Sequence, residues 1–246
     1  MELKGKTALV TGGGTGIGRA ASLTLAEKGA FVAVNYSRSK KDAEETVRMI
    51  EERGGSAIAV KADVSNAREV DEMVERIVER YGSLDLLVNN ASITHHVALP
   101  DLDGVEDTMW DELFAVNVKG MFHCARAAAP WMKKSGRGAI VNLGSIAGIT
   151  GVGSSLPYAV SKAAVHGLTK SLAHALAPEI RVCSVVPGAV ETRWWAGREE
   201  KMRALSPQLP LRRVSTPEDI AHFICAVLEQ EAITGQIITV DSGQTM

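Results

Sequence analysis

The chain has 246 residues, which at about 150 residues per domain corresponds to one large domain or two small ones. Its 27 basic and 29 acidic residues nearly balance, which excludes the strong field of a protein that binds nucleic acid or an anionic membrane. The three cysteines, Cys124, Cys183 and Cys225, are too far apart in the sequence for a disulfide framework or a cysteine zinc site. No apolar run is long enough to span a membrane, and none follows Met1 as a signal core, so we expect a soluble, cytoplasmic protein.

Short apolar runs alternate with amphipathic segments such as Asp42–Arg53 and Ala67–Arg80 along the whole chain. Most of the runs are apolar throughout, as in strands buried on both faces of a parallel sheet. This alternation predicts an α/β fold with a doubly wound, Rossmann-type parallel sheet of seven strands and helices on both faces, in a single domain over residues 1–246. The expected strands are Thr7–Thr11, Phe31–Asn35, Ala57–Lys61, Leu84–Asn89, Ala139–Leu143, Arg181–Val186 and Ile237–Val240.

One long connection, from about residue 190 to 216, interrupts the alternation. It contains the pair Trp194-Trp195 and ends where Thr216-Pro217 opens the next helix, with Thr216 as the expected cap. A connection of this length inside a compact domain is usually functional. We therefore expect a flap over the substrate site, although the tryptophans can equally serve ordinary packing.

A glycine-rich turn, Thr11-Gly12-Gly13-Gly14-Thr15-Gly16-Ile17-Gly18, follows the first expected strand and opens a helix from Arg19 to Lys28. Glycines let the backbone approach a pyrophosphate closely, and the free N–H groups at a helix start favour its charge. Glycine content alone would also suit a tight turn without a ligand. The place of this turn, at the start of an alternating chain, favours a dinucleotide.

Tyr158 and Lys162 are four residues apart, so on a helix they lie on one face, one turn from each other. An isolated tyrosine has a pKa of about 10, and a neighbouring ammonium favours the phenolate and lowers that value. Such a phenol can protonate a carbonyl oxygen that accepts hydride, or deprotonate an alcohol that donates one. Ser145, at the end of the fifth expected strand, can hydrogen-bond the same oxygen. A tyrosine and a lysine on a solvated helix face are the alternative.

The glycine spacing G-x3-G-x-G, together with Ser145, Tyr158 and Lys162, resembles the short-chain dehydrogenase/reductase family, in particular its 3-oxoacyl-[acyl-carrier-protein] reductase-like subgroup. The resemblance covers essentially the whole chain. It implies a fourth catalytic residue, Asn117, whose main-chain carbonyl holds a water that links the lysine to solvent. Asn117 as an ordinary polar packing residue is the alternative.

The resemblance also implies cofactor contacts at the ends of the strands. Asp63-Val64 matches the adenine site, Asn90-Ala91 the adenosine ribose, and Pro187-Gly188-Ala-Val-Glu-Thr192 the nicotinamide carboxamide and pyrophosphate. Ser92 and Ser242 stand where the family has glycine more often, and a serine is costlier than glycine at positive φ. The expected cofactor-binding residues are Gly12, Gly14, Thr15, Gly16, Ile17, Gly18, Asn35, Ser37, Arg38, Asp63, Val64, Asn90, Ala91, Tyr158, Lys162, Pro187, Gly188, Val190 and Thr192.

The end of the second expected strand indicates which nicotinamide cofactor is bound. NAD-selective members of the family place an acidic residue there, but here no acid precedes Asp42. Arg38 can pair with a 2′-phosphate, and Ser37 or Asn35 can add hydrogen bonds. These charges would also suit the solvated start of a helix. We favour NADP, with NAD as the alternative.

We therefore expect an NAD(P)(H)-dependent oxidoreductase that transfers a hydride between nicotinamide and a small ketone or secondary alcohol. One alternative is an NAD-dependent steroid, sugar or polyol dehydrogenase of the same family. The other, a non-catalytic nucleotide-sensing regulator, would have lost Tyr158 or Lys162, and both are present. The adjacent histidines His95 and His96 lack partners at ligand spacing, so we expect no metal site.

Small residues recur at four-residue steps, as Ala159, Ala163 and Gly167, on the expected helix from Tyr158 to Ala177. Such a face permits the close approach of another helix. In the family this helix pairs with the one matching Asp107–Lys134 to form dimers, and the last strand completes tetramers. The resemblance thus implies a homo-oligomer, either a dimer or a tetramer.

Overall fold

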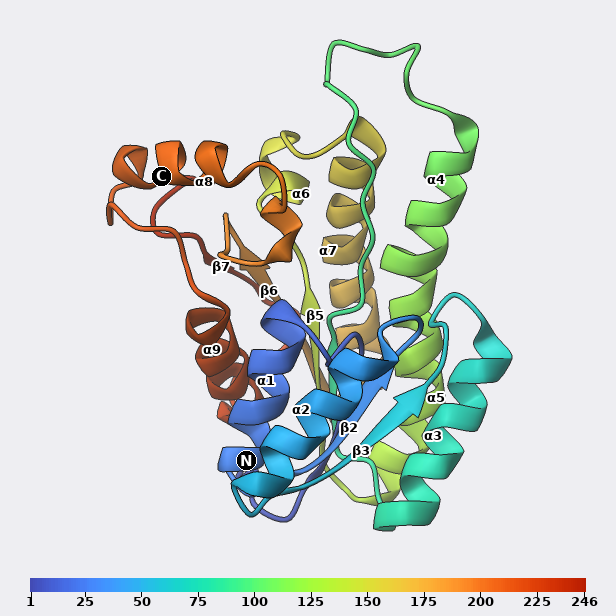
Figure 1. Ribbon diagram of the computed structural model, residues 1–246. Helices are drawn as coiled ribbons and strands as arrows, with labels where there is room; N and C mark the ends of the chain where they lie inside the picture. Colours follow the sequence, from blue (N-terminus) through green and yellow to red (C-terminus); the bar gives the residue numbers. More distant parts are fainter.

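A single parallel sheet of seven strands runs through the molecule in the order β3-β2-β1-β4-β5-β6-β7 (Figure 1). The computed structural model describes all 246 residues. The order reverses between β1 and β4, and in such sheets ligands bind at the carboxyl ends of the strands beside that reversal. The strands are β1 (Thr7–Val10), β2 (Phe31–Tyr36), β3 (Ser56–Lys61), β4 (Leu86–Asn89), β5 (Gly138–Leu143), β6 (Ile180–Pro187) and β7 (Ile237–Val240).

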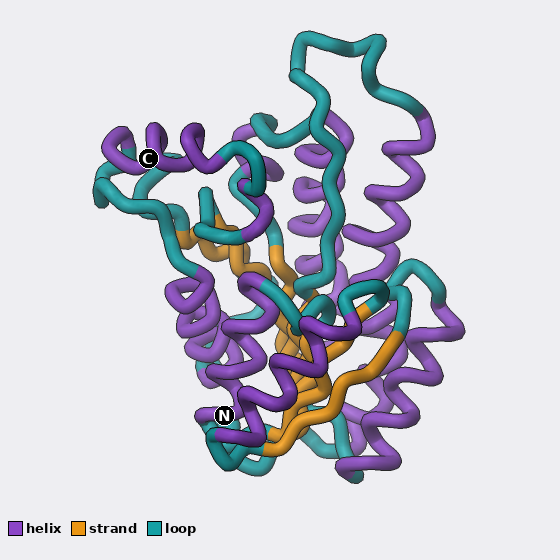
Figure 2. Tube along the Cα trace, in the orientation of Figure 1, coloured by secondary structure: helices purple, strands orange, loops and turns teal.

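Helices cover both faces of the sheet, and Figure 2 shows the strands enclosed between the two helical layers. One layer consists of α1, α2 and α9, and the other of α3, α5 and α7. The helices are α1 (Gly16–Glu27), α2 (Lys40–Glu52), α3 (Ala67–Tyr81), α4 (Asp107–Phe114), the π-helical η1 (Ala115–Gly120), α5 (Met121–Lys134), α6 (Ala147–Thr150), α7 (Leu156–Leu176), the 3₁₀ turn η2 (Arg193–Trp195), α8 (Glu199–Leu205), the 3₁₀ turn η3 (Ser206–Gln208) and α9 (Pro217–Glu229).

Strand residues alternate between two hydrophobic cores because successive side chains point to opposite faces of the sheet. Ala8 and Val10 face the layer of α1, α2 and α9, while Leu9 between them faces α3, α5 and α7. All three side chains are completely buried. The predicted doubly wound sheet with helices on both faces is therefore confirmed.

All seven expected strands are present, and apart from those of β7 their bounds differ from the expectation by one or two residues. Helix α1 begins at Gly16 rather than Arg19, so two glycines of the turn belong to its first turn. Strand β4 begins at Leu86 rather than Leu84, and the carboxylate of the preceding Asp85 accepts the Thr7 N–H at 2.9 Å. The segment after β6 is not irregular throughout, since it contains η2, α8 and η3.

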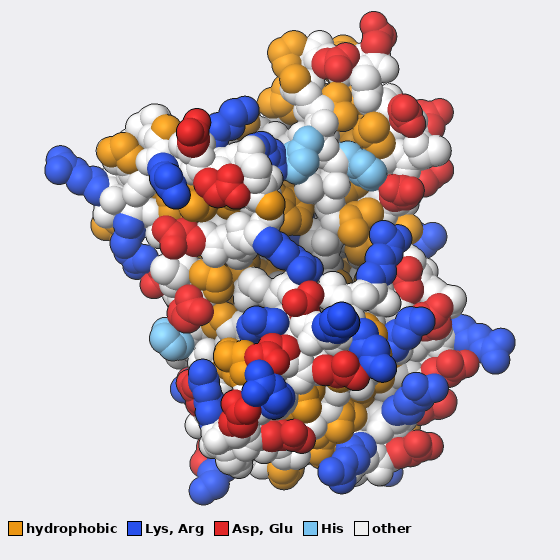
Figure 3. All heavy atoms as spheres, viewed as in Figure 1, with side chains coloured by type: hydrophobic (Ala, Val, Ile, Leu, Met, Phe, Trp, Pro, Cys, Tyr) orange, Lys and Arg blue, Asp and Glu red, His pale blue; other side chains and the backbone are white.

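The surface mixes both signs of charge. Figure 3 shows basic and acidic side chains intermingled over the visible face, without an extended patch of one sign. None of the helices combines the length and the apolar character that crossing a bilayer demands.

Candidate active site

The glycine-rich turn is shaped by close packing against the start of α1. Gly12 and Gly16 adopt positive φ, +61° and +51°, which favours glycine over other residues. A Cβ on Gly18 would lie 2.2 Å from the Gly12 carbonyl oxygen, so no side chain fits there. Gly14 is equally constrained, since a Cβ would lie 2.8 Å from the backbone nitrogen of Ala43 in α2. The turn is therefore held tightly between α1 and α2.

The N-terminus of α1 is suited to an anion. Its first N–H groups have no partner within the helix, and the capping residue Thr15 accepts no hydrogen bond with its side chain. No acidic residue lies in the first turn, which includes Ile17 and Gly18. Free N–H groups and the positive end of the helix dipole together favour a phosphate, so this part of the chain fits a dinucleotide pyrophosphate.

Asn35 and Asn90 fasten the glycine-rich turn to the sheet. The Asn35 amide accepts from the Gly12 N–H at 3.2 Å and donates to the carbonyl oxygens of Val60 and Ala62. The Asn90 amide donates to the carbonyl oxygens of Thr11 and Gly12, at 2.9 and 3.2 Å. Asn35 is only 1% exposed with its amide fully engaged, so its side chain positions the turn and is not free to bind a phosphate, contrary to our expectation.

Thr11 is a positioning residue whose role no motif in the sequence indicates. Its hydroxyl accepts the backbone N–H groups of Asn90 and Ala91, at 2.9 and 3.0 Å. This joins the end of β1 to the end of β4 at the point where the strand order reverses.

The residues expected at the adenosine end lie after β2 and β3. Ser37 and Arg38 are exposed in the turn between β2 and α2, and the Arg38 guanidinium makes no hydrogen bond or ion pair within the protein. Asp63 follows β3, and one carboxylate oxygen accepts from the Ser65 N–H and hydroxyl, at 2.9 and 2.7 Å. The next residue, Val64, is buried. Arg38 is thus a free cation, and Asp63 keeps its second carboxylate oxygen free of hydrogen bonds within the protein.

The last group of expected cofactor residues follows the carboxyl end of β6. Pro187 ends the strand, and a Cβ on Gly188 would meet Asp241 at 2.7 Å. Val190 forms an isolated bridge with Ser215, which closes the base of the segment from 190 to 216. Thr192 then caps the turn η2, its hydroxyl accepting the Trp194 N–H.

Ser145, Tyr158 and Lys162 meet beyond the carboxyl end of β5. The two helical residues lie one turn apart on α7, with the Lys162 Nζ 5.8 Å from the centroid of the Tyr158 ring. The ammonium donates to the Leu143 carbonyl oxygen at 3.0 Å, which fixes the lysine against the strand that leads to Ser145. Tyr158 is 9% exposed and Lys162 only 2%.

Burial dominates the acid–base properties of this pair. It raises the pKa of Tyr158 to about 12, against a smaller lowering by the hydrogen bond with Ser145. Burial likewise lowers the pKa of Lys162 to about 8. The lowering that we expect from the neighbouring lysine is not seen in the net pKa of Tyr158 in this structure, because burial disfavours the charged phenolate.

Asn117 lies in the π-helical segment η1, between α4 and α5. Its side chain is fully buried and makes four hydrogen bonds: it accepts from the Ser92 hydroxyl and the Ile93 N–H, and donates to the Ile93 carbonyl and the Ser161 hydroxyl. It thus joins the loop after β4 to α7, beside the tyrosine. Ser92 is not at positive φ, so its replacement of glycine causes no strain, whereas Ser242 does adopt φ +57°.

The flap lies against Tyr158. The rings of Trp194 and Tyr158 are 5.6 Å apart between centroids, inclined at 50°. No group of three or more His, Cys, Asp or Glu side chains could hold a metal ion. His95 instead contacts Glu112, and His96 contacts Arg198 of the flap.

Comparison with known proteins identifies the family. Residues 6–203 match the family model described as short chain dehydrogenase. The chain is a short-chain dehydrogenase/reductase. It is 40% identical over 245 residues to the 3-oxoacyl-[acyl-carrier-protein] reductase FabG of Staphylococcus aureus, covering 98% of each chain.

Two further relatives support membership of the short-chain dehydrogenase/reductase family. Over 129 residues the chain is 70% identical to the short-chain dehydrogenase/reductase homolog YusR of Bacillus subtilis, which covers 52% of this chain and all of that protein. A crystal structure of a short-chain type dehydrogenase/reductase from Mycobacterium marinum superposes with a TM-score of 0.92 at 33% identity, covering 99% and 97% of the two chains. The protein is thus an oxidoreductase of a family that acts on CH–OH and C=O groups and uses nicotinamide cofactors.

Proposed function

We propose that this short-chain dehydrogenase/reductase transfers a hydride between NADP(H) and a carbonyl or secondary alcohol, with Tyr158 as the general acid and base. The observation that carries the proposal is the convergence of Ser145, Tyr158 and Lys162 at the carboxyl end of β5. This edge of the sheet also holds the anion-binding start of α1, so a reacting group and a dinucleotide can occupy one cleft.

Each of the three side chains has a distinct role in the proposed chemistry. A bound nicotinamide dinucleotide supplies or accepts the hydride, and its oxidised ring adds a positive charge that favours the phenolate. In reduction, Tyr158 donates its hydroxyl proton to the carbonyl oxygen, and in oxidation it removes the proton of the alcohol. Ser145 donates a hydrogen bond to that oxygen as charge develops on it. The buried Lys162 lies beside the phenol to favour its ionised form.

The preference for NADP rests on Arg38. This exposed guanidinium makes no hydrogen bond or ion pair within the protein, and Ser37 precedes it in the same turn. A free guanidinium suits the bidentate recognition of a 2′-phosphate. The other residues that we expect to bind the cofactor keep that role in this proposal. Asn35 is the exception, because its side chain supports the glycine-rich turn.

The substrate belongs to the class of ketones and secondary alcohols. Because the Staphylococcus aureus relative is named as a 3-oxoacyl-[acyl-carrier-protein] reductase, a 3-oxoacyl thioester is the first carbonyl compound to test. The segment from 190 to 216 serves as the substrate flap of the single domain, which its closed base and the contact between Trp194 and Tyr158 support.

The proposal also includes the cellular compartment and the oligomeric state of the enzyme. Three free, buried cysteines suit a reducing compartment, and we propose the cytoplasm. We also propose a homo-oligomer, a dimer or tetramer, in which α5 and α7 contribute the interface. Phe122 on α5 and Val160 on α7 support this, since both are large apolar side chains more than 40% exposed.

The proposal is tested by following the consumption of NADPH and NADH against a panel of ketones and 3-oxoacyl thioesters. We expect turnover with NADPH, and a loss of at least about 100-fold in Tyr158→Phe, which removes the phenolic hydroxyl and with it the exchangeable proton. Arg38→Ala should weaken NADPH binding by about tenfold and leave NADH unchanged, as expected for the loss of a charge-assisted pair.

Three outcomes would contradict it. Full activity of Tyr158→Phe would remove the tyrosine from the chemistry. A wild-type preference for NADH would favour the NAD-dependent steroid, sugar or polyol dehydrogenase. Binding of NADP(H) without turnover on any substrate would favour the nucleotide-sensing regulator.

A further inference from the structure

The first part of the flap, Thr192–Arg198, runs from the glycine-rich turn past Tyr158 to His96. We refer to it as the crossing segment. At its start the Thr192 side chain lies over the glycine-rich turn, where a Cβ on Gly16 would come within 3.3 Å of it. In its middle Trp194 contacts Tyr158, and at its end Arg198 contacts His96 beyond β4. The crossing segment therefore covers the site at which the phosphates of a dinucleotide would lie.

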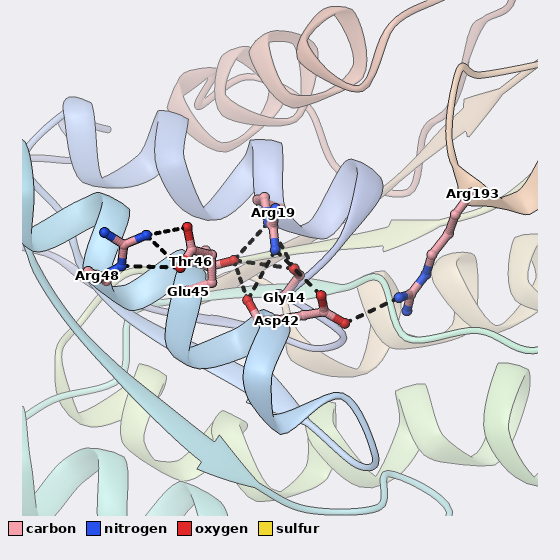
Figure 4. Close-up of polar contacts among 7 residues, drawn as sticks. All are labelled: Gly14, Arg19, Asp42, Glu45, Thr46, Arg48 and Arg193. Carbon is pink, nitrogen blue, oxygen red and sulfur yellow. Dashed lines mark hydrogen bonds and ion pairs between the residues drawn. The ribbon is translucent and has the colours of Figure 1, made fainter.

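Arg193 ties this segment to the cofactor side of the molecule. Its Nη1 lies 3.3 Å from the Oδ2 of Asp42, which belongs to the first turn of α2. Figure 4 shows Arg193 reaching out of the flap toward that carboxylate. The two residues are 151 positions apart in the sequence, so the ion pair joins two separate parts of the fold.

Asp42 is itself fixed to the glycine-rich turn through Arg19 of α1. The Arg19 Nε donates to the Gly14 carbonyl oxygen at 2.9 Å, and its Nη2 donates to the Asp42 carbonyl and lies 3.8 Å from the Asp42 carboxylate (Figure 4). A continuous path of polar contacts thus runs from the flap, through Asp42 and Arg19, to the backbone that would hold the phosphates.

The ion pair is not needed for the stability of the fold. The side chains of Arg193 and Asp42 are 62% and 42% exposed, and ion pairs at that exposure contribute little to stability. The ion pair between Arg193 and Asp42 instead fixes the position of the crossing segment relative to the glycine-rich turn.

We propose that Arg193 and Asp42 form a positioning pair that holds the crossing segment closed over the phosphates of the bound nicotinamide dinucleotide and so slows its release. This rests on the proposed function only in that a dinucleotide binds at the start of α1. Arg193 acts through Asp42 and not on the reacting atoms. Because the segment lies over the pyrophosphate site, it retains NADH and NADPH alike, whereas Arg38 discriminates between them.

The test compares release rates of bound NADH, measured by stopped-flow fluorescence on mixing with excess oxidised cofactor. NADH is the better probe because it lacks the 2′-phosphate. A change of charge at Asp42 would also alter the binding of that phosphate and so obscure the effect of the ion pair. Arg193→Gln and Asp42→Asn should each accelerate release about three- to fivefold, in keeping with a partly exposed ion pair. The double variant should release NADH no faster than either single variant.

Three comparisons make the test specific. Arg193→Lys keeps the charge and should restore a rate close to that of wild type. Arg203→Gln removes an exposed charge of the flap that forms no ion pair, and should release NADH at the wild-type rate. At about 1 M salt, where the Debye length is only about 3 Å, the differences should vanish.

Several results would overturn the inference. These are release rates that do not differ between variants, acceleration in Arg193→Gln without acceleration in Asp42→Asn, additive effects in the double variant, or an equal effect of Arg203→Gln. A wild-type protein that binds neither dinucleotide would overturn the proposed function, and the inference with it. Normal binding with unchanged release would overturn the inference alone.

Discussion

Lys162 is the residue whose environment differs most from its ordinary one. The side chain is 2% exposed, its ammonium has a single hydrogen-bond acceptor in the protein, the Leu143 carbonyl, and burial lowers its pKa to about 8. Burial of this ammonium lowers the free energy of unfolding, because water solvates the charge fully in the unfolded chain and not in the folded one. The cost depends on pH, which makes it measurable.

We expect the difference in free energy of unfolding between wild type and Lys162→Met to change with pH. Between a folded pKa of about 8 and the ordinary 10.5, the unfolded state keeps a proton that the folded state has lost, so wild type gains stability as pH rises. From pH 7.5 to pH 9.5 the gain relative to Lys162→Met should be about 2 kcal/mol. Urea denaturation of the two proteins at each pH measures it.

Titrating groups that do not contact Lys162, such as the buried cysteines, are common to both proteins and cancel in this difference. Lys170→Met, which changes an exposed lysine two turns further along α7, is the matched control and should show no such trend. A pH-independent difference for Lys162→Met would mean that the lysine is not desolvated as described.

Residue types at the site were predictable, but their partners were not. The spacing of Tyr158 and Lys162 follows from helix geometry and needs no tertiary information. The direction of the tyrosine pKa in this structure does need it, because the direction depends on how much of the phenol the flap and α6 cover. The Asn35 amide likewise has partners in the glycine-rich turn and at the end of β3, which no local pattern reveals.

At the scale of elements, the π-helical turn η1 is the clearest structural mark of a functional site. π-helical turns are rare and often mark functional sites. Here the turn contains Asn117, which fixes the loop after β4 against α7 through four buried hydrogen bonds. The expected helix over Asp107–Lys134 is present, but no pattern in the sequence indicates that its turns widen at this residue.

Asn117→Ala should destabilise the protein by about 2–4 kcal/mol, because it leaves several buried donors and acceptors without partners. Ser92→Ala, which removes one of the four contacts, should cost only about 1 kcal/mol. Both are measured by urea denaturation with wild type as reference. Equal stability of Asn117→Ala and wild type would show that the turn is held by other contacts.

At the scale of the whole molecule, the exposed face of α7 differs from the expected one. Ala159 is 4% exposed and packs inside, while Ala163 and Gly167 are exposed together with Val160. A step of four residues advances about 40° past a full turn of a helix with 3.6 residues per turn, so Ala159 falls at the buried edge of this face. The outward stripe is therefore Val160, Ala163 and Gly167.

If α7 and α5 form the proposed interface, Val160→Glu should lower the mass measured by light scattering at micromolar concentration. A buried charge at a contact between two copies is costly, so we expect dissociation to smaller species. Lys170→Glu, a change of charge at an exposed position of the same helix, is a control for surface charge. A monomeric wild type would contradict the proposal outright.

The sequence by itself determined the layered parallel sheet, the glycine-rich turn before α1 and the residues Ser145, Tyr158 and Lys162. These depend on periodicity and spacing, which are local properties of the chain. Only the tertiary structure decided that Asn35 is a buried support, that Trp194 lies on the tyrosine, and that Arg193 pairs with Asp42. Those contacts join residues far apart in the sequence, and their free energies depend on burial and distance, which exist only after the chain has folded.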